Sequence, residues 1–379
     1  MGADQLSRFF DEHATIAFPT EHDQHLDTLA TTLPSPWRDN GRKRWLVTDP
    51  KQAHQILTSR AFTNDLTLAG AESGSTLLQR RISPEPPSIL FTEGELHQVL
   101  RRPLAQRYRA PERDVDAFAA RVAERLIAAT ADGASFDLGA IVFDALAETT
   151  LPIFDITEPN RHLVVKYVFA INKLFDLGCD ASEHAEGNEA RARLREALRQ
   201  AFVGGSAGVS ATWSTAGVPI DAQISSAEFA IRAAIVTAGT LLLNAVVLLL
   251  VFDETAEAFY ERGVDSVDEL LARAASALDT GRIALADTVV GDATIRAGET
   301  VICLLAVAGR RDGRGFPRSL FVFGAGRHRC VGMYAVRAEL EAMLDLLRGI
   351  DRLTIDRPPV LQTTPSFRGV RELWVSASR

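Results

Sequence analysis

One ten-residue loop, residues 323–332, constrains this 379-residue chain more than any other stretch. Its glycines let the backbone approach something flat and bulky. Arg327, His328 and Arg329 place positive charge beside Cys330, and a helical pattern begins directly after the loop. Positive charge and a helix N-terminus both lower the pKa of a thiol. The loop therefore predicts a thiolate presented to a large anionic cofactor, whereas an isolated cysteine would indicate a buried structural residue.

The composition indicates a soluble protein with a sizeable core. Its residues are 46% apolar, and its net charge of −8 argues against nucleic acid as a partner. Cys179, Cys303 and Cys330 are too few and too scattered for a disulfide framework or a zinc site. A reducing, cytoplasmic setting is therefore expected. The N-terminus has no basic region followed by an apolar run, so no secretion signal is expected.

Residues 235–252 are nearly all apolar and about long enough to cross a bilayer. Thr237, Thr240 and Asn244 interrupt this run, and no aromatic belt or basic flank follows it. A buried central helix is therefore expected, with no membrane span.

Hydrophobic periodicity predicts one mainly α domain, residues 1–379, with a small β portion. Helices are predicted over 51–59, 96–108, 111–130, 136–150, 160–177, 182–202, 226–252, 253–277 and 332–347. Strands are predicted over 45–50, 283–290, 294–305 and 353–376. Residues 1–24 are interpreted as a surface arm, 63–90 as a long irregular connection over a binding site, and 204–219 as a flexible connector.

The loop resembles the F-G-x-G-x-H-x-C-x-G pattern of the cytochrome P450 superfamily, and all its fixed positions are present. The resemblance implies the cytochrome P450 fold of bacterial soluble members, with a long helix over a haem b. Cys330 is then the axial ligand of the iron. Phe323, Gly324, His328 and Gly332 are expected to be cofactor-binding residues.

Two further segments extend this resemblance. His97 and Arg101 match the H-x-x-x-R of the family's C-helix, and Arg282 follows Thr280-Gly281 as in the family. The resemblance implies that all three side chains reach haem propionates. Their charge and the i, i+4 spacing of His97 and Arg101 on one helix face suit that role.

The long helix departs from the family pattern. Residues 238–242 stand where the family usually has A-G-x-[Asp or Glu]-Thr, so Leu241 occupies the acid position and Leu242 the alcohol position. At about 100° per residue, one face of this helix carries Ile235, Gly239, Leu242, Leu243 and Val246. The resemblance implies that this face points toward the haem. Thr240 and Asn244 lie on another face with Thr237, where we expect hydrogen bonds within the protein. The candidate catalytic residues are Cys330, Gly239, Leu242, Thr240 and Asn244.

The cysteine side of the haem, the proximal side, also departs from the family pattern. Glu269 begins an E-x-x-R pattern in which Ala272 takes the arginine position and Arg273 comes one residue late, turned about 100° around the helix. The segment between residues 317 and 320, where the family has its meander, is much shorter than usual. We interpret both losses as one coherent redesign.

The resemblance implies a haem-thiolate oxidoreductase acting on a small, secondary-metabolite substrate, in a pocket lined by residues 63–90, 160–178 and the long helix. The missing acid–alcohol pair favours atypical chemistry on a substrate N–O or O–O bond, such as nitrene transfer or rearrangement. A conventional dioxygen-dependent monooxygenase served by ferredoxin and a reductase is the alternative. Basic residues around the cysteine would either dock an acidic ferredoxin or compensate propionate charge; they are Arg310, Arg311, Arg314, Arg318, Arg327 and Arg329. A non-catalytic haem-binding or recruitment domain is the third interpretation.

Overall fold

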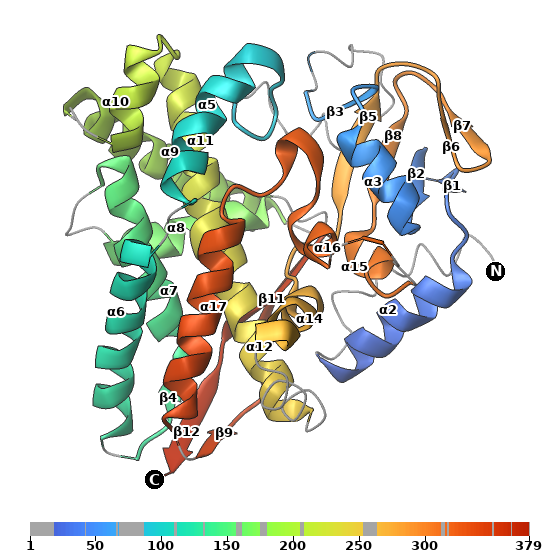
Figure 1. Ribbon diagram of the computed structural model, residues 1–379. Coiled ribbons are helices and arrows are strands. Elements are labelled where there is room, and N and C mark those ends of the chain that lie inside the picture. Colours follow the sequence, from blue (N-terminus) through green and yellow to red (C-terminus); the bar gives the residue numbers. More distant parts are fainter. Residues whose placement is uncertain are drawn as a thin grey trace.

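The computed structural model describes residues 19–41, 43–65, 67, 87–109, 112–131, 133–156, 161–174, 180–204, 208–252, 264–311, 315–316, 318–350, 352–364 and 366–378. Most of the helices gather on one side of the molecule, and a small sheet with two helices from the N-terminal part forms the other side (Figure 1). The expected mainly helical fold with a small β portion is confirmed.

The helices follow the predicted order closely. They are α2 (Thr20–Thr32), α3 (Pro50–Thr58), α5 (Gly94–Arg107), α6 (Glu112–Thr130), α7 (Leu138–Thr150), α8 (Arg161–Lys173), α9 (Ala181–Gly204), α10 (Gly208–Thr215), α11 (Ile220–Arg232), α12 (Ala238–Val251), α14 (Val264–Ala274), α15 (Leu305–Ala308), α16 (Ser319–Phe323) and α17 (Met333–Arg348). Three short turns join them, namely η1 (Leu151–Phe154), the π-helical η2 (Ala233–Thr237) and η3 (Gly326–His328).

The largest sheet has the strand order β1-β2-β8-β5-β3. Its strands are β1 (Trp37–Asp39), β2 (Arg44–Val47), β8 (Thr300–Cys303), β5 (Thr280–Ala284) and β3 (Phe62–Thr63). β2 and β8 run parallel, and the other pairs are antiparallel. The smaller sheets are the β6 (Thr288–Val290) and β7 (Ala293–Ile295) hairpin, the β10 (Val360–Thr364) and β11 (Phe367–Glu372) hairpin, and β4 (Phe136–Asp137) with β12 (Trp374–Ser378) and β9 (Arg352–Ile355).

Local sequence explains where the helix α3 begins. The side chain of Asp49 accepts a hydrogen bond from the backbone N–H of Gln52, and Pro50 occupies the first turn. Both features stabilise a helix N-terminus. Ala53 and Ile56 then fall on one face and are fully buried, as the 3.6-residue period predicts.

The long apolar helix is central. It runs through α11, η2 and α12, and α12 crosses behind α17 in Figure 1. Its contacts include α7, α14, α17 and β11. Within the described residues, the stretch Ile220–Val251 is long and apolar enough to span a bilayer, but 72% of its most apolar window is buried inside the protein. This burial agrees with the predicted core helix.

Two expectations about connections are wrong. Residues 208–215, predicted as part of a flexible connector, form α10, because Val209 and Trp213 bury an apolar face. The predicted surface arm is helical from Thr20, and His22 and Asp23 are buried. Residues 1–18 and most of the expected 63–90 connection, residues 66 and 68–86, lie outside the described residues.

Candidate functional site

The cysteine loop joins α16 to α17 and folds back on itself. Gly324 ends α16 with φ +68°, and the backbone N–H of Cys330 donates to the carbonyl of Phe323 at 2.8 Å. Gly326 has φ +72°, and a Cβ there would lie 2.2 Å from the carbonyl oxygen of Leu57. Only glycine fits this approach of the loop to α3. The predicted tight bend is therefore fixed from both sides, and Cys330 remains exposed.

The surroundings of Cys330 act on its thiol in opposite directions. Desolvation by the neighbouring protein raises the pKa of the Cys330 thiol, although the residue keeps exposed surface. A hydrogen bond from the backbone N–H of Gly332 and the charges of Arg101 and Arg329 favour the thiolate and lower its pKa. Gly332 stands at the N-terminus of α17. The loop is thus prepared to hold a thiolate when a positive partner neutralises it.

His97, Arg101 and His328 come together beside the loop, as predicted. The rings of His97 and His328 lie with their centroids 4.3 Å apart. Arg101 donates to the carbonyl of Arg329, so part of its guanidinium holds the cysteine loop itself. Arg282, on β5, is 6% exposed and donates to the Gly281 carbonyl at 2.6 Å.

Glu93 is a site residue that the sequence reasoning missed. It precedes α5 and accepts hydrogen bonds from Arg327 at 2.5 Å and from the ring of His328 at 3.1 Å. Burial raises the pKa of Glu93, but Arg327 and His328 outweigh burial, and the net pKa is lowered. Burial, and then His97, lower the pKa of His328 to about 4, so His328 is neutral near pH 7. The missed signal was the position of Glu93 directly before the helix that carries His97, since Glu93 is the N-cap residue of α5.

These residues fit an anionic haem, which carries two propionates. The side chain of His97 is 4% exposed, and its Nε2 has no hydrogen-bond partner within the described part of the chain. A buried polar atom of this kind is normally paired, so it marks a place for an acceptor such as a carboxylate. The partly exposed Arg101 and the buried Arg282 add positive charge, and desolvation lowers the pKa of each guanidinium.

The predicted distal face of the long helix is wrong. Gly239 packs against α7, because a Cβ there would lie 2.4 Å from Cε1 of Phe143 and 3.1 Å from Leu146. Leu242 has no exposed surface. The other members of the predicted face, Ile235, Leu243 and Val246, are at most 1% exposed. The face count assumed a regular helix, but η2 is a π turn, which shifts the faces on either side of it relative to each other.

Thr240 and Asn244 make hydrogen bonds within the protein, as expected, and these bonds correct the prediction that the two residues are catalytic. The Thr240 hydroxyl donates to the carbonyl of Val236 at 2.7 Å. The Asn244 amide donates to the carbonyl of Ala274 at 3.0 Å and accepts from the backbone N–H of Val370 at 3.0 Å. Asn244 therefore ties α12 to α14 and β11.

The late arginine of the E-x-x-R pattern and the shortened segment before the cysteine loop are both held by ion pairs to α2. Glu269 is exposed, and Arg273 pairs with Asp23 of α2 at 2.8 Å. Arg310 pairs with the same carboxylate at 2.6 Å. Most of the predicted basic cluster thus bonds to other groups of the protein, since Arg311 and the exposed Arg318 donate to backbone carbonyls and Arg327 pairs with Glu93. Arg314 lies outside the described residues.

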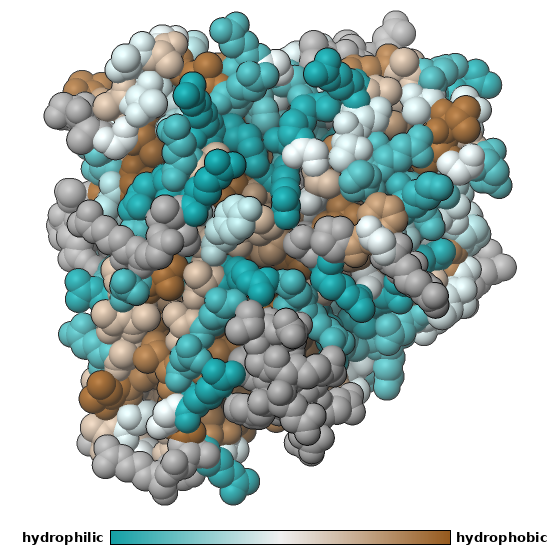
Figure 2. All heavy atoms as spheres, in the orientation of Figure 1, coloured by the Kyte–Doolittle hydropathy of each residue, from teal (hydrophilic) through white to brown (hydrophobic). Residues whose placement is uncertain are grey.

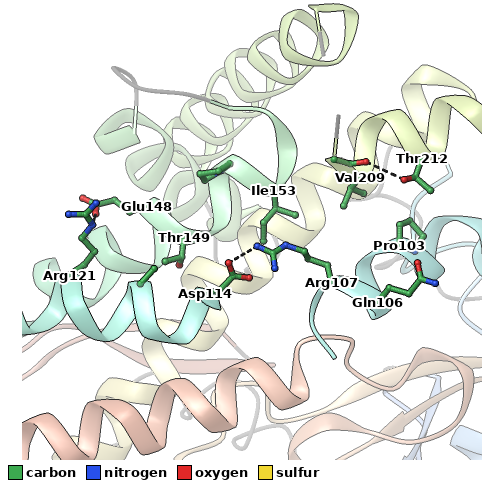
Figure 3. Close-up of a pocket in the computed structure, with 13 residues that line it drawn as sticks. Pro103, Gln106, Arg107, Asp114, Arg121, Glu148, Thr149, Ile153, Val209 and Thr212 are labelled. Atoms are coloured by element: carbon green, nitrogen blue, oxygen red, sulfur yellow. Dashed lines mark hydrogen bonds and ion pairs between the residues drawn. The ribbon is translucent and has the colours of Figure 1, made fainter. Parts of the chain in front are cut away.

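A groove of about 820 Å³ lies apart from the cysteine loop, between α5, α6, η1 and α10 (Figure 3). Its charged side chains pair with one another, as Arg107 does with Asp114 at 2.5 Å and Arg121 with Glu148 at 2.8 Å. A second groove of about 720 Å³ lies between α8 and α9. No cluster of three or more metal-binding side chains occurs among the described residues, and a haem iron needs only one such ligand here.

No model of a known protein family matches the chain. A mycinamicin VIII C21 methyl hydroxylase of Micromonospora griseorubida is 38% identical over 127 residues, which cover 29% of this chain and 32% of that protein. Cytochrome P450-SU2 of Streptomyces griseolus is 34% identical over 138 residues, covering 32% and 34% of the two chains. The matches thus span about a third of the length of these relatives.

Solved structures match over nearly the whole chain. Mycobacterium smegmatis CYP164A2 has a TM-score of 0.80 at 20% identity, covering 99% of this chain and 100% of its own. The mycinamicin VIII hydroxylase of Micromonospora griseorubida bound to mycinamicin VIII has a TM-score of 0.73 at 22% identity, covering 90% and 92%. The fold of this chain is the fold of these cytochrome P450 structures.

Proposed function

We propose that this protein is a haem-thiolate oxidoreductase that acts on a small, secondary-metabolite substrate in the cytoplasm. The observation that carries the proposal is the exposed Cys330 in the loop of His328, whose ring lies against buried His97, the Nε2 of which has no partner among the described residues. Cys330 would hold the iron of a haem b, while His97, Arg101 and Arg282 would hold its propionates. When bound, the haem supplies the activation of an O–O or N–O bond. The names of the relatives, which include hydroxylases, support an oxidative reaction.

The helix α12 supports atypical chemistry that needs no acid–alcohol relay. Leu241 and Leu242 occupy the relay positions and are 4% and 0% exposed. Thr240 and Asn244 are engaged in structural hydrogen bonds. A substrate that already carries an N–O or O–O bond would not require this helix to deliver protons to dioxygen. Nitrene transfer and hydroperoxide rearrangement are reactions of this class.

A conventional monooxygenase served by ferredoxin is the second candidate. Arg102 and Arg109 are exposed at α5, and Tyr334 at the start of α17 is 51% exposed. Hydrophilic side chains gather on this face around α5 (Figure 2). Exposed cations and an exposed aromatic residue suit an acidic protein partner. Arg310, Arg311 and Arg327 bond to other groups of the protein. Docking of ferredoxin would therefore depend on other arginines.

One experiment on the haem-loaded protein separates these functions. The carbon-monoxide spectrum of the reduced protein is recorded first, with Cys330→Ser as the control that removes the thiolate. We expect a thiolate band that Cys330→Ser abolishes. Absence of this band from the native protein would leave only the third interpretation, a non-catalytic haem-binding or recruitment domain.

Turnover is then measured in two arms. An organic hydroperoxide and an O-acyl hydroxamate are supplied anaerobically, and dioxygen consumption is measured separately with surrogate ferredoxin and reductase. Anaerobic conversion of either compound supports the atypical reaction. Dioxygen consumption coupled to substrate hydroxylation, without anaerobic turnover, would overturn it in favour of the monooxygenase.

A further inference from the structure

We propose that the hydroxyl of Thr237 is the hydrogen-bonding group that contacts the ligand on the distal side of the cofactor. This inference rests on the proposed haem-thiolate function. It assigns the polar role to a residue five positions before Leu242, which occupies the usual alcohol position.

The long helix has one open side near its π turn. Ala233, Ala234, Thr237 and Ala238 are partly exposed, whereas Ile235 and Val236 between them are completely buried. A helix that passes through the core exposes such a face only where it borders a space. Three of the four residues are alanines, which leave room for a bulky group beside the backbone.

The other two sides of the helix are occupied. On one side Gly239 meets Phe143 of α7 so closely that a Cβ would lie 2.4 Å from the ring. On another side Thr240 packs on Gly369 of β11, where a Cβ would lie 2.3 Å from Cβ of Thr240. These two contacts leave the side of Ala234, Thr237 and Ala238 uncovered.

Thr237 brings a free hydroxyl to that side. Its backbone carbonyl is already occupied, accepting from Oγ of Ser276 at 3.0 Å and from Oγ1 of Thr240 at 3.2 Å. The Ser276 donor is the shorter of the two and holds the backbone of Thr237, whereas the shorter bond of Thr240 goes to the carbonyl of Val236 at 2.7 Å. Within the described part of the chain its own Oγ1 has no hydrogen-bond partner, and the residue is partly exposed. The nearby polar side chains of Thr240 and Asn244 are buried and engaged.

A hydroxyl in this position donates one hydrogen bond and accepts another. It can orient an oxygen or nitrogen atom of the substrate and stabilise negative charge on it, without being an acid itself. One such bond changes affinity or rate by about tenfold. This suits a substrate with a polar N–O or O–O group inside an otherwise apolar pocket.

The test uses carbon monoxide bound to the reduced haem-loaded protein, whose C–O stretching frequency senses a nearby hydrogen-bond donor. Thr237→Val, which keeps the shape and removes the hydroxyl, is expected to shift the frequency, and Thr237→Ser to restore it. Thr240→Val is the matched control on the same helix, and we expect no shift because that hydroxyl donates to a backbone carbonyl. Anaerobic turnover should fall about tenfold in Thr237→Val alone.

The outcomes distinguish this inference from the function on which it rests. An unchanged frequency in Thr237→Val, or an equal shift in Thr240→Val, would overturn the role of Thr237 while a normal thiolate band left the haem-thiolate function intact. Absence of the thiolate band from the native protein would overturn both. Melting temperatures of the three variants show whether any shift comes from misfolding, and Thr237→Ser keeps the test valid if the valine variant is unstable.

Discussion

The carboxylate of Asp23 joins α2 to α14, with its Oδ2 2.8 Å from Nη2 of Arg273. Its Oδ1 lies 2.6 Å from Nη2 of Arg310, in the segment that follows α15. Arg273 is the arginine that comes one residue late for an E-x-x-R pattern. The N-terminal helix therefore supplies the carboxylate that holds this arginine, and it also ties down the shortened segment before the cysteine loop.

Asp23→Asn should destabilise the protein by about 3 kcal/mol, because it removes the charge that Arg273 pairs with and leaves Arg310 with only the exposed Asp27. Urea unfolding measures this loss as a lower midpoint. Asp27→Asn is the matched control, since Asp27 also pairs with Arg310 but its side chain is 63% exposed, and we expect a loss below about 1 kcal/mol. Equal losses in the two variants would contradict the role given to Asp23.

Gly239→Ala tests whether this glycine is a packing residue. Its Cβ would overlap the ring of Phe143, so we expect a loss of about 1–3 kcal/mol in thermal or urea unfolding. Adding Phe143→Leu to Gly239→Ala should recover part of that loss, because the ring edge is removed. If Gly239→Ala instead altered turnover at unchanged stability, the catalytic assignment of Gly239 would return.

Asn244→Ala should cost about 2–3 kcal/mol, since it leaves the buried N–H of Val370 and the carbonyl of Ala274 without their partner. The thiolate band of the carbon-monoxide complex should remain. Stability is read from urea unfolding and the band from absorption. A stable variant that had lost the band would instead place Asn244 at the cofactor.

Glu339 should make stability depend on pH. Burial, and then the charge of Asp114, raise the pKa of Glu339 to about 8 from an ordinary 4.5. Between those values the folded protein holds a proton that the unfolded chain has lost, so stability falls as pH rises, by about 1.4 kcal/mol per pH unit. Glu339→Gln should remove this contribution, so its stability should fall less steeply between pH 5 and pH 8 in urea titrations. Identical slopes would show that Glu339 is ionised in the fold.

Leu242→Thr alone should not create an efficient hydroxylase. Leu242 is completely buried, and Leu241 still occupies the acid position. We expect a stability loss of about 1–3 kcal/mol from placing a hydroxyl in this apolar core, with no gain in coupled dioxygen consumption. Coupled hydroxylation by this single variant would contradict the interpretation of α12.

The order of helices and strands could be predicted well because each has its own hydrophobic periodicity and its own capping, glycine or proline residues at its ends. The helix α3 begins at Pro50 after the Asp49 cap, within a residue of its predicted start. The partner of His328 could not be predicted with the same ease, because Glu93 lies 235 residues away along the chain. Such pairs depend on how distant elements pack, which local spacing does not encode.

The cysteine loop and its cationic neighbours could be recognised from residue types and spacing, because glycine geometry and thiolate chemistry are local properties. The open side of the long helix could not be recognised in this way, because it depends on the packing of distant elements. A π turn at Ala233–Thr237 shifts the helix faces, and α7 and β11 then cover the sides that carry Gly239 and Thr240. Those contacts leave Thr237 partly exposed, which an even count of 100° per residue does not reveal.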